Sequence, residues 1–277
     1  MNKYIAGFCG AVLIALFVVS AGGVLAQETG DAVNEESGAA YNAGLELFGK
    51  RRYAEAIPHF VKAYELDERN VAALFAHGLS LNNLKKYKEA APVFKSVLDK
   101  EPDHSKALVL YPMALERAEL NAEAIAAYTS GLGIDAENTN LYWGRARAYL
   151  RMEKFKEALA DLDKALKFDA DNLKIQFLRA QTLVNLGRSD DAYKAATAIL
   201  RKDAKHARSR VIVADYLRQQ GKLDEALTAY REAAKSIETK AYAEHYIEVI
   251  NQQKEEDEIE REYQERLKRQ ETEKKAP

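Results

Sequence analysis

The chain has 277 residues, of which 41 are basic and 43 are acidic, and its formal net charge at neutral pH is −2. This near balance excludes a general electrostatic attraction to nucleic acid or to anionic lipid. A single cysteine, Cys9, excludes a disulfide framework and a metal site built from thiolates.

Residues 1–26 have the composition of a secretory signal peptide. Lys3 and the amino terminus precede 23 uncharged residues, Tyr4 to Ala26, and the apolar core of this run is residues 11–19. Small residues at both cleavage positions predict a cut after Ala26. The alternative is an uncleaved anchor, because a run of this length also suffices to span a bilayer of roughly 30 Å.

Cys9 lies inside this leading segment, so cleavage would leave a chain without cysteine. Lipidation of Cys9 is not expected, because Phe8 stands where a small residue is needed. An exported domain without disulfides fits the bacterial periplasm, and membrane contact is expected only if the segment is retained. Residues 27–36 follow as a short acidic stretch without periodicity, which predicts a disordered leader.

From residue 37 onward the sequence repeats at an interval of 34 residues. Within residues 71–104, apolar and small residues are spaced 4 and 3 residues apart in each half, which is the spacing of one helix face. A turn at residues 84–87 separates the two halves, and Pro102 ends the second because proline cannot continue a helix. Each unit is therefore predicted to be a helical hairpin. The six units are residues 37–70, 71–104, 105–138, 139–172, 173–206 and 207–240.

Three positions of the unit show how its two helices would pack. Position 20 is alanine in all six units, and position 8 is small in most of them. Position 24 is a large residue in five of the six, as in Phe60, Phe94 and Tyr128. Small residues where helices touch, with a large residue beside them, predict a knob that fits a notch.

The period, the small residue at position 8, the alanine at position 20 and the aromatic at position 24 together resemble the tetratricopeptide repeat family. The resemblance covers residues 37–240 without an insertion. It implies an all-α fold, a right-handed α-solenoid of six helical hairpins whose stability sums over repeats and their interfaces.

Residues 241–277 are predicted to cap the array and then to extend it as a charged helix. Tyr242, Tyr246, Val249 and Ile250 fall on one face and would cover the last hairpin. Beyond residue 250 the segment is mostly charged, and its apolar residues Ile259, Tyr263 and Leu267 stand at a spacing of 4. Two interpretations remain open for this stripe, a solvated helix that frays and a contact with a partner.

No catalytic or cofactor motif is present. The sequence contains no glycine-rich phosphate loop, no nucleophile elbow and no His/Cys/Glu cluster at metal-ligand spacing. The five histidines do not converge on one repeat position, because only His104 and His206 share one, so surface or packing roles are predicted for His59, His77, His104, His206 and His245. We therefore expect no enzyme, no cofactor and no bound metal.

The resemblance implies that positions 2, 5, 9, 12 and 13 of each repeat face a groove. The groove would be apolar toward its N-terminal end and polar toward its C-terminal end, which suits an extended peptide or an amphipathic helix. The alternative is that the aromatic residues at position 5 pack between neighbouring first helices. The predicted groove residues are Tyr41, Leu45, Phe75, Leu79, Lys106, Val109, Met113, Arg117, Trp143, Arg147, Arg151 and Phe177.

Basic residues among them predict a strip for an acidic segment or a terminal carboxylate, with solvated charge as the alternative. Chaperone-type relatives clamp a carboxylate with residues at five fixed positions. Only Lys106 matches that pattern, while Tyr41, Leu45, Ala76 and Leu110 depart from it. That clamp is therefore not expected here.

Two departures from the family pattern carry structural expectations. Arg145 and Arg179 occupy position 7, which is normally apolar, so they should pair with Asp161 or Asp163 unless the groove is wetter than usual. Pro112 occupies position 8 inside a first helix, so that helix should bend or begin late.

The sequence thus favours an exported, non-catalytic scaffold that binds a protein or peptide partner in a groove. The alternative is a structural platform that associates with copies of itself through the terminal repeat and the stripe of Ile259, Tyr263 and Leu267. The identity of a partner does not follow from the fold.

Overall fold

The computed structural model describes the backbone of residues 35–275 and the side chains of residues 35–270. The predicted signal peptide and residues 27–34 of the predicted leader lie outside the described residues. The described part is entirely helical and contains no strand. Its helices are α1 (Glu35–Gly49), α2 (Tyr53–Leu66), α3 (Val71–Asn83), α4 (Tyr87–Lys100), α5 (Ser105–Arg117), α6 (Asn121–Ile134), α7 (Thr139–Arg151), α8 (Phe155–Phe168), α9 (Leu173–Asn185), α10 (Ser189–Lys202), α11 (Ala207–Gln219), α12 (Leu223–Ala233) and α13 (Lys240–Lys275).

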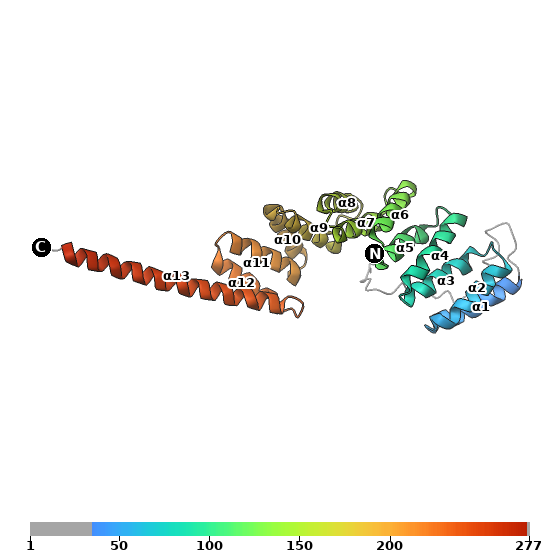
Figure 1. The fold of residues 1–277 in the computed structure, drawn as a ribbon, viewed down its shortest axis with the longest axis horizontal. Coiled ribbons are helices and arrows are strands. Elements are labelled where there is room, and N and C mark those ends of the chain that lie inside the picture. Colours follow the sequence, from blue (N-terminus) through green and yellow to red (C-terminus); the bar gives the residue numbers. More distant parts are fainter. Residues whose placement is uncertain (1–34, 276–277) are drawn as a thin grey trace, which may run out of the picture.

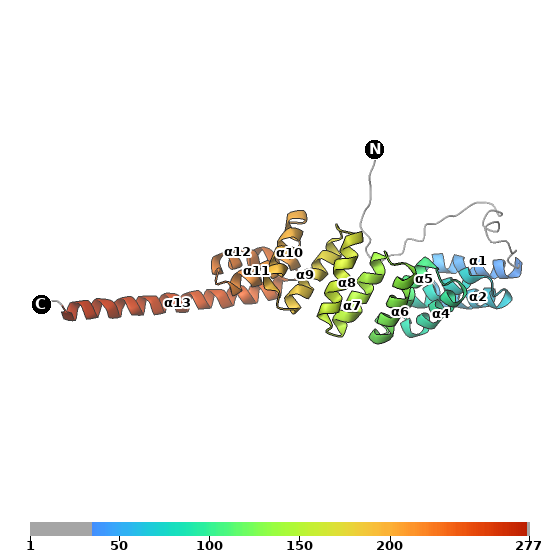
Figure 2. The ribbon, with the colours of Figure 1, turned by 90° about the horizontal axis from the view of Figure 1, so that it is seen from above.

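Each helix packs against the next one in the chain, and the hairpins follow one another along the long axis (Figure 1). The α13 helix begins against α12 and continues past the array as a single helix, which both views show (Figure 2). The predicted all-α solenoid of six hairpins with a C-terminal capping helix is confirmed. The first helix begins at Glu35, two residues before the first predicted repeat.

The alanine column forms the inner seam of the hairpins. All six alanines at position 20 are at most 1% exposed, which removes any room for a larger side chain where the helices touch. The large residues at position 24 lie in the same core, and Phe60, Phe94 and Tyr128 are nearly inaccessible. The column comprises Ala56, Ala90, Ala124, Ala158, Ala192 and Ala226.

Glycine supplies the notch in the first two repeats. A Cβ atom on Gly44 would lie 2.6 Å from the Phe60 ring, and one on Gly78 would lie 2.8 Å from the Phe94 ring. Carbon atoms cannot approach so closely, so only glycine leaves room for these rings. The predicted knob and notch are confirmed in these two hairpins.

The turn inside every hairpin contains one residue in the left-handed region, always at position 15. The φ angles are 59° at Arg51, 60° at Lys85, 65° at Glu119 and 57° at Glu153. Gly187 and Gly221 occupy the same position in the fifth and sixth repeats, at 70° and 72°. Four repeats thus place a side chain where glycine is favoured, which makes these turns locally unfavourable.

In repeats two to six, the N-terminus of the first helix is capped by the residue at position 34 of the preceding repeat. The Asn70, Asn138 and Asn172 side chains accept backbone N–H bonds from the first turn of α3, α7 and α9. His104 and His206 do the same through Nδ1, accepting from Ala107 and Ser209. Each cap satisfies donors that a helix start leaves unpaired.

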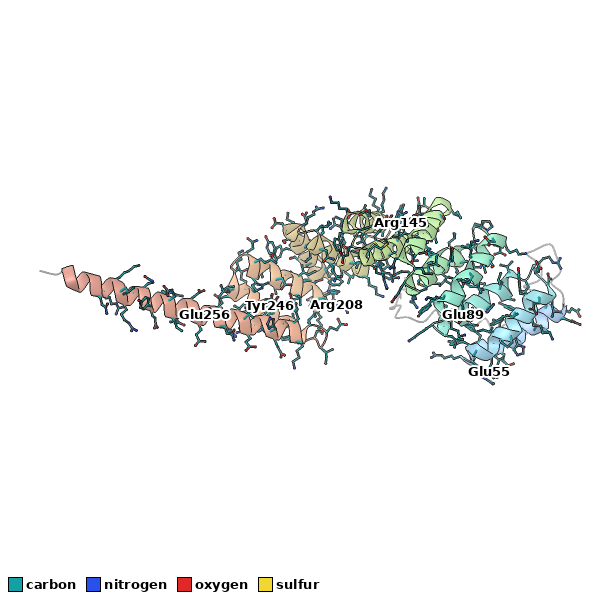
Figure 3. All side chains as sticks on the ribbon, viewed as in Figure 1. Glu55, Glu89, Arg145, Arg208, Tyr246 and Glu256 are labelled. Carbon is teal, nitrogen blue, oxygen red and sulfur yellow. The ribbon has the colours of Figure 1, made fainter. Side chains whose placement is uncertain are left out.

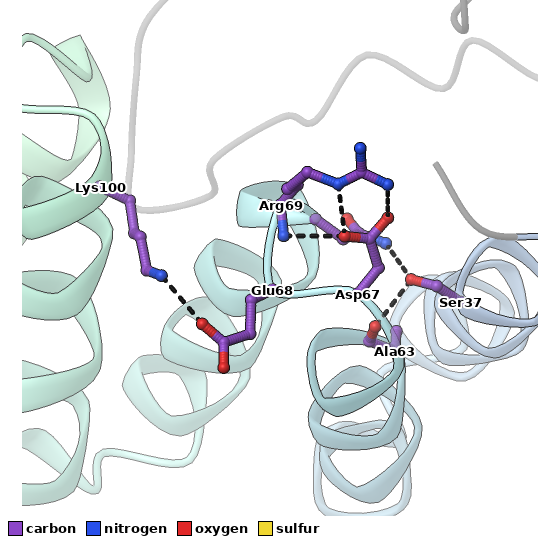
Figure 4. Close-up of polar contacts among 7 residues, drawn as sticks. Ser37, Ala63, Asp67, Glu68, Arg69 and Lys100 are labelled. Carbon is purple, nitrogen blue, oxygen red and sulfur yellow. Dashed lines mark hydrogen bonds and ion pairs between the residues drawn. The ribbon is translucent and has the colours of Figure 1, made fainter. Parts of the chain in front are cut away.

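Polar contacts also surround the loop between the first two repeats, as Figure 4 shows. The Ser37 hydroxyl donates to the Ala63 carbonyl at 2.7 Å and accepts from the Asn70 side chain at 2.9 Å. Lys100 of α4 reaches Glu68, in the loop after α2, at 3.1 Å. The buried Ser37 bonds therefore fix the start of α1 to the loop between the repeats.

Both arginines at position 7 are paired with the aspartates that were predicted for them. Arg145 donates to Asp161 from Nε and Nη2, at 2.7 Å each, and Nη1 donates to Thr129 at 2.9 Å. Arg179 donates to Asp163 at 2.5 Å. Arg145 is therefore held by the second helix of its own hairpin, α8, and also ties repeat four to repeat three, whereas Arg179 of α9 is held by α8 of the preceding hairpin.

The expectation of a late start for the helix that contains Pro112 is wrong. The α5 helix begins at Ser105, the same repeat position at which α3, α7, α9 and α11 begin, and it runs through the buried Pro112. The His104 cap supplies an ordinary helix start, so the missing N–H of Pro112 costs one bond in the interior without delaying the helix.

The α13 helix covers the sixth hairpin with its first three turns. Ala243 and Ile250 are fully buried, and Tyr246 stacks on Tyr230 with ring centroids 5.6 Å apart. Figure 3 labels Tyr246 at this junction and Glu256 further along the helix. The predicted cap is confirmed, because these residues close the apolar end of the array.

Candidate functional site

The twelve predicted groove residues lie on five first helices, and we call the surface that they form the first-helix face. Leu45, Lys106, Arg117 and Arg151 are exposed, and most of the others are half-buried. Leu79 differs from the rest, because it is 9% exposed and belongs to the core of repeats two to four. The helices that carry these residues are α1, α3, α5, α7 and α9.

Aromatic residues at position 5 of this face pack mainly within their own repeats. Tyr41 lies 5.8 Å from Phe60, between ring centroids. Phe75 lies 5.8 Å from Phe94 and 4.6 Å from the capping His104. Phe177 and His206 repeat this last contact at 5.0 Å. Each of these rings is therefore held by contacts within its own repeat and is only half-buried, so together they form a rigid surface.

A buried carboxylate lies at the centre of the first-helix face, between repeats three and four. Glu116 is fully buried on α5, and it pairs with Arg147 and, at 3.4 Å, with Arg151 of α7. Arg147 also lies over the Trp143 ring, 4.7 Å from its centroid. Two of the predicted basic residues, Arg147 and Arg151, are thus already paired with Glu116 of the same chain.

Tyr128 completes this cluster from the second helix of repeat three. Its hydroxyl donates to Glu116 at 3.2 Å, and burial, together with the nearby carboxylate, raises the pKa of Tyr128 above its ordinary value. The ring fits against Gly144, where a Cβ atom would lie 2.3 Å from it. The glycine that admits this ring therefore belongs to the next repeat, not to its own.

A second carboxylate cluster lies where α13 joins the sixth repeat. Asp215 accepts hydrogen bonds from the Tyr230 hydroxyl and, at 3.1 Å, from the Tyr242 hydroxyl. Burial raises the pKa of Asp215 above its ordinary value, although both hydroxyls act in the opposite direction. Arg218 lies over the Tyr246 ring at 4.5 Å. This cluster joins the cap to the array.

Sequence reasoning missed the role of Glu116. Its position 12 is one of the groove positions, and it directly precedes the predicted Arg117. The available signal was an acid and two arginines, Arg147 and Arg151, in the groove positions of consecutive repeats. Arg117 remains apart from the cluster, because it contacts the ring and the hydroxyl of Tyr87, at 5.3 Å and 3.2 Å.

A shallow apolar pocket of about 300 Å³ opens away from the predicted site, between α2, α3 and α4. Burial lowers the pKa of His77, which lies in its wall, although Glu89 acts in the opposite direction. No group of three His, Cys, Asp or Glu side chains among the described residues is placed to hold a metal ion. The pocket is lined by Phe60, Tyr64, Leu74, His77, Pro92 and Val93, among others.

A profile of the tetratricopeptide repeat matches residues 41–105, 75–139, 144–192 and 177–242, which together make up most of the chain. The chain belongs to the tetratricopeptide repeat family. Such repeat proteins are scaffolds that bind protein or peptide partners. No curated protein sequence matches the chain significantly.

Solved structures of other tetratricopeptide repeat proteins share the fold. MamA (41-end) from Desulfovibrio magneticus RS-1 is 18% identical with a TM-score of 0.58, over 63% of this chain and 99% of that one. YrrB, described as a TPR protein with an unusual peptide-binding site, is 19% identical with a TM-score of 0.58, over 68% and 96%. Yeast Tom70 is 18% identical with a TM-score of 0.56, over 73% and 44%. Identities this low show the fold alone.

Within residues 35–275, none of the helices combines the length and the apolar character needed to cross a membrane. The long α13 helix is mostly charged beyond its capping turns.

Proposed function

We propose that this tetratricopeptide repeat protein is a non-catalytic scaffold whose first-helix face binds an extended peptide or a helix of a protein partner. Family membership supports a role in protein–protein interaction. The observation that carries the proposal is the mixed character of this face. Leu45 is 38% exposed, and Tyr41 and Phe75 are half-buried and held by ring contacts with Phe60 and Phe94. Lys106 and Arg117 are exposed on α5, the first helix of the third repeat.

The face would bind apolar side chains of the partner through repeats one to three. Val109 and Met113 of α5 are half-buried, as are Tyr41 and Phe75, whereas Leu45 is exposed. Because these side chains are already partly desolvated and rigidly supported, a partner that covers them gains apolar burial at a small entropic cost. Leu79 contributes to this surface only from within the core.

An acidic group of the partner would face Lys106 and Arg117. Arg117 is exposed and contacts the ring and the hydroxyl of Tyr87, whereas Arg147 and Arg151 share the buried Glu116. The attraction available to a partner is therefore greatest at Arg117 and Lys106 and smaller at the Glu116 cluster.

The test is capture of partners from the native cell envelope with quantitative mass spectrometry. Leu45→Ala combined with Met113→Ala should reduce recovery of the partner at least several-fold, while helix content and thermal stability stay unchanged. Ile134→Ala is the matched control, because Ile134 is exposed and apolar but ends a second helix, α6. Unchanged capture by the double variant would refute the proposed surface. Substitution of Leu79 would not serve, since it opens a cavity in the core.

Arg117→Glu tests the polarity of the face separately. It should weaken capture at low salt, and raising the ionic strength should reduce the difference from the wild type. A loss of capture that does not depend on salt would contradict a charge-based role for Arg117.

We further propose that the protein is exported to the bacterial periplasm and cleaved after Ala26. The support is the sequence of residues 1–26, with its basic start, apolar core and small residues at the cleavage positions. Amino-terminal sequencing of the protein recovered from a periplasmic fraction should begin at Gln27. An intact amino terminus in the membrane fraction would instead show that the segment is kept as an anchor.

A further inference from the structure

The part of α13 beyond the repeats carries a narrow apolar stripe on an otherwise polar helix. Ile250 is the last buried residue, and every residue from 251 to 270 is exposed. We call residues 251–275 the tail. Its apolar residues among the described side chains are Ile259, Tyr263 and Leu267, which are 61%, 53% and 36% exposed. Steps of four residues turn a helix by about 40°, so the three side chains lie on one face.

This stripe has two-fold symmetry within the tail. Ile259 and Leu267 stand four residues before and four residues after Tyr263. A two-fold axis at Tyr263 would therefore place Ile259 of one copy against Leu267 of a second copy, twice. It would also place residue 275 of each α13 beside residue 251 of the other, next to the capped end of that copy's repeat array. The overlap would cover the whole tail, about 37 Å.

The charges of the tail favour the antiparallel orientation. The seven residues before Tyr263, 256–262, contain five carboxylates and one arginine, whereas the seven after it, 264–270, contain one carboxylate and three basic residues. Antiparallel pairing sets each acidic half against a basic half. Parallel pairing would set like charges against each other over residues 256–270, which is unfavourable.

We propose that the tail is a self-association surface, which pairs with the tail of a second copy as an antiparallel two-helix coiled coil centred on Tyr263. The partner is the same surface of an identical chain, which is the arrangement of a closed, two-fold dimer. The two repeat arrays then stand at opposite ends of the paired helices, so each first-helix face keeps its own surface. The association is reversible, because three apolar side chains per copy cover less than the roughly 1,200 Å² of a stable interface.

Sedimentation measurements on the protein purified from cells that express the full chain test the surface. The mass should rise toward that of two chains as the concentration increases. Ile259→Ser combined with Leu267→Ser should leave a monomer at every concentration. Both side chains are exposed in the tail, so the double variant should keep the fold of the repeats. Ile237→Ser is the matched control, because Ile237 is 92% exposed but lies in the loop before α13, and its mass should still double. A monomeric wild type, or a double variant that still dimerises, would overturn the proposal.

Disulfide trapping tests the orientation. In a Cys9→Ser background, Ile259→Cys and Leu267→Cys chains should form a disulfide-linked dimer when they are mixed and oxidised, and neither should do so alone. Efficient linkage of Ile259→Cys chains to each other would show a parallel pair and overturn the proposed arrangement. Linkage of Ile259→Cys to a Leu45→Cys chain in place of Leu267→Cys would show that the tail occupies the first-helix face of another copy, which would also overturn it.

Discussion

Repeats one and two differ from repeats three and six in one atom of the residue at position 24. Phe60 and Phe94 fill a notch opposite a glycine of their own first helix and make an apolar contact. Tyr128 and Tyr230 bring a hydroxyl into the same buried position, and each donates to a carboxylate on its own first helix, Glu116 and Asp215 respectively.

Repeats with this added hydroxyl also have a more polar first-helix face. Glu116 forms ion pairs with Arg147 and Arg151, and Asp215 accepts a hydrogen bond from Tyr242. Above Phe60 and Phe94, by contrast, the first-helix face remains aromatic and aliphatic. In these four repeats the polarity of the first-helix face follows the hydrogen-bonding needs of the residue at position 24, because a buried hydroxyl or carboxylate without a partner is costly.

Removal of the central acid should have the largest effect on this difference. Glu116→Ala leaves the Tyr128 hydroxyl without its acceptor and Arg147 without its carboxylate, so the free energy of unfolding should fall by about 2–3 kcal/mol. The value is below that of a fully buried ion pair because Arg147 and Arg151 are partly exposed. Urea denaturation measures it, with the exposed Glu137→Ala as a control that should change stability by less than about 0.5 kcal/mol. Equal effects of the two variants would contradict the assigned role of Glu116.

The glycine that admits Tyr128 offers the next test. A Cβ on Gly144 would overlap the buried ring, so Gly144→Ala should destabilise the protein by about 1–2 kcal/mol, even after the gain in helix propensity. Gly133→Ala is the matched control, because no atom lies within 4 Å of its added Cβ and it also lies in a helix. Thermal melting should show Gly133→Ala as stable as the wild type or slightly more so, and destabilisation by both would remove the steric explanation.

Exchange of the two aromatic types should sharpen the comparison directly. Tyr128→Phe removes one hydrogen bond to Glu116 and should cost about 1 kcal/mol. Phe94→Tyr adds a hydroxyl to a notch in which Phe94 is fully buried, and should cost about 1–3 kcal/mol. If either exchange proved neutral in denaturation experiments, position 24 would not control the polarity of its repeat.

A smaller effect is expected from pH in the second repeat. Burial lowers the folded-state pKa of His77, so the folded state binds its proton less readily than the unfolded state does. The associated stability is present above the ordinary histidine pKa and is lost as the pH falls below it. The melting temperature of the wild type should therefore fall between about pH 7.5 and about pH 5.5 by more than that of His77→Gln. Identical pH profiles would show that His77 makes no contribution.

Periodic features of the sequence predicted the parts of the structure that depend on period. The alanine column, the pairing of Arg145 and Arg179 with aspartates, and the cap from α13 all follow from equivalent positions in successive hairpins. The left-handed residue at position 15 was missed, because only Gly187 and Gly221 show its usual residue type and the other four repeats use charged side chains there.

The candidate site was less predictable than the fold for a physical reason. Its residues lie at groove positions, but the exposure of each side chain depends on contacts between neighbouring repeats. The residue types at one repeat position do not reveal those contacts. Leu79 points into the core, and Arg147 is drawn to Glu116 of the preceding repeat. Tyr128 fits against Gly144 of the next repeat, whereas Pro112 occupies the glycine position of its own repeat. The notch for this ring therefore lies in a different repeat from the ring itself.

The central claim is that the first-helix face of the early repeats binds a protein partner. Photo-crosslinking in the native cell envelope tests it most directly, with a photoreactive residue in place of Leu45 and, in a second variant, in place of Lys95, an exposed residue of the second helix α4. The account predicts adducts of a distinct protein from position 45 that are absent from position 95. Adducts of that protein from position 95 alone, or adducts from position 45 only with copies of the same chain, would contradict it.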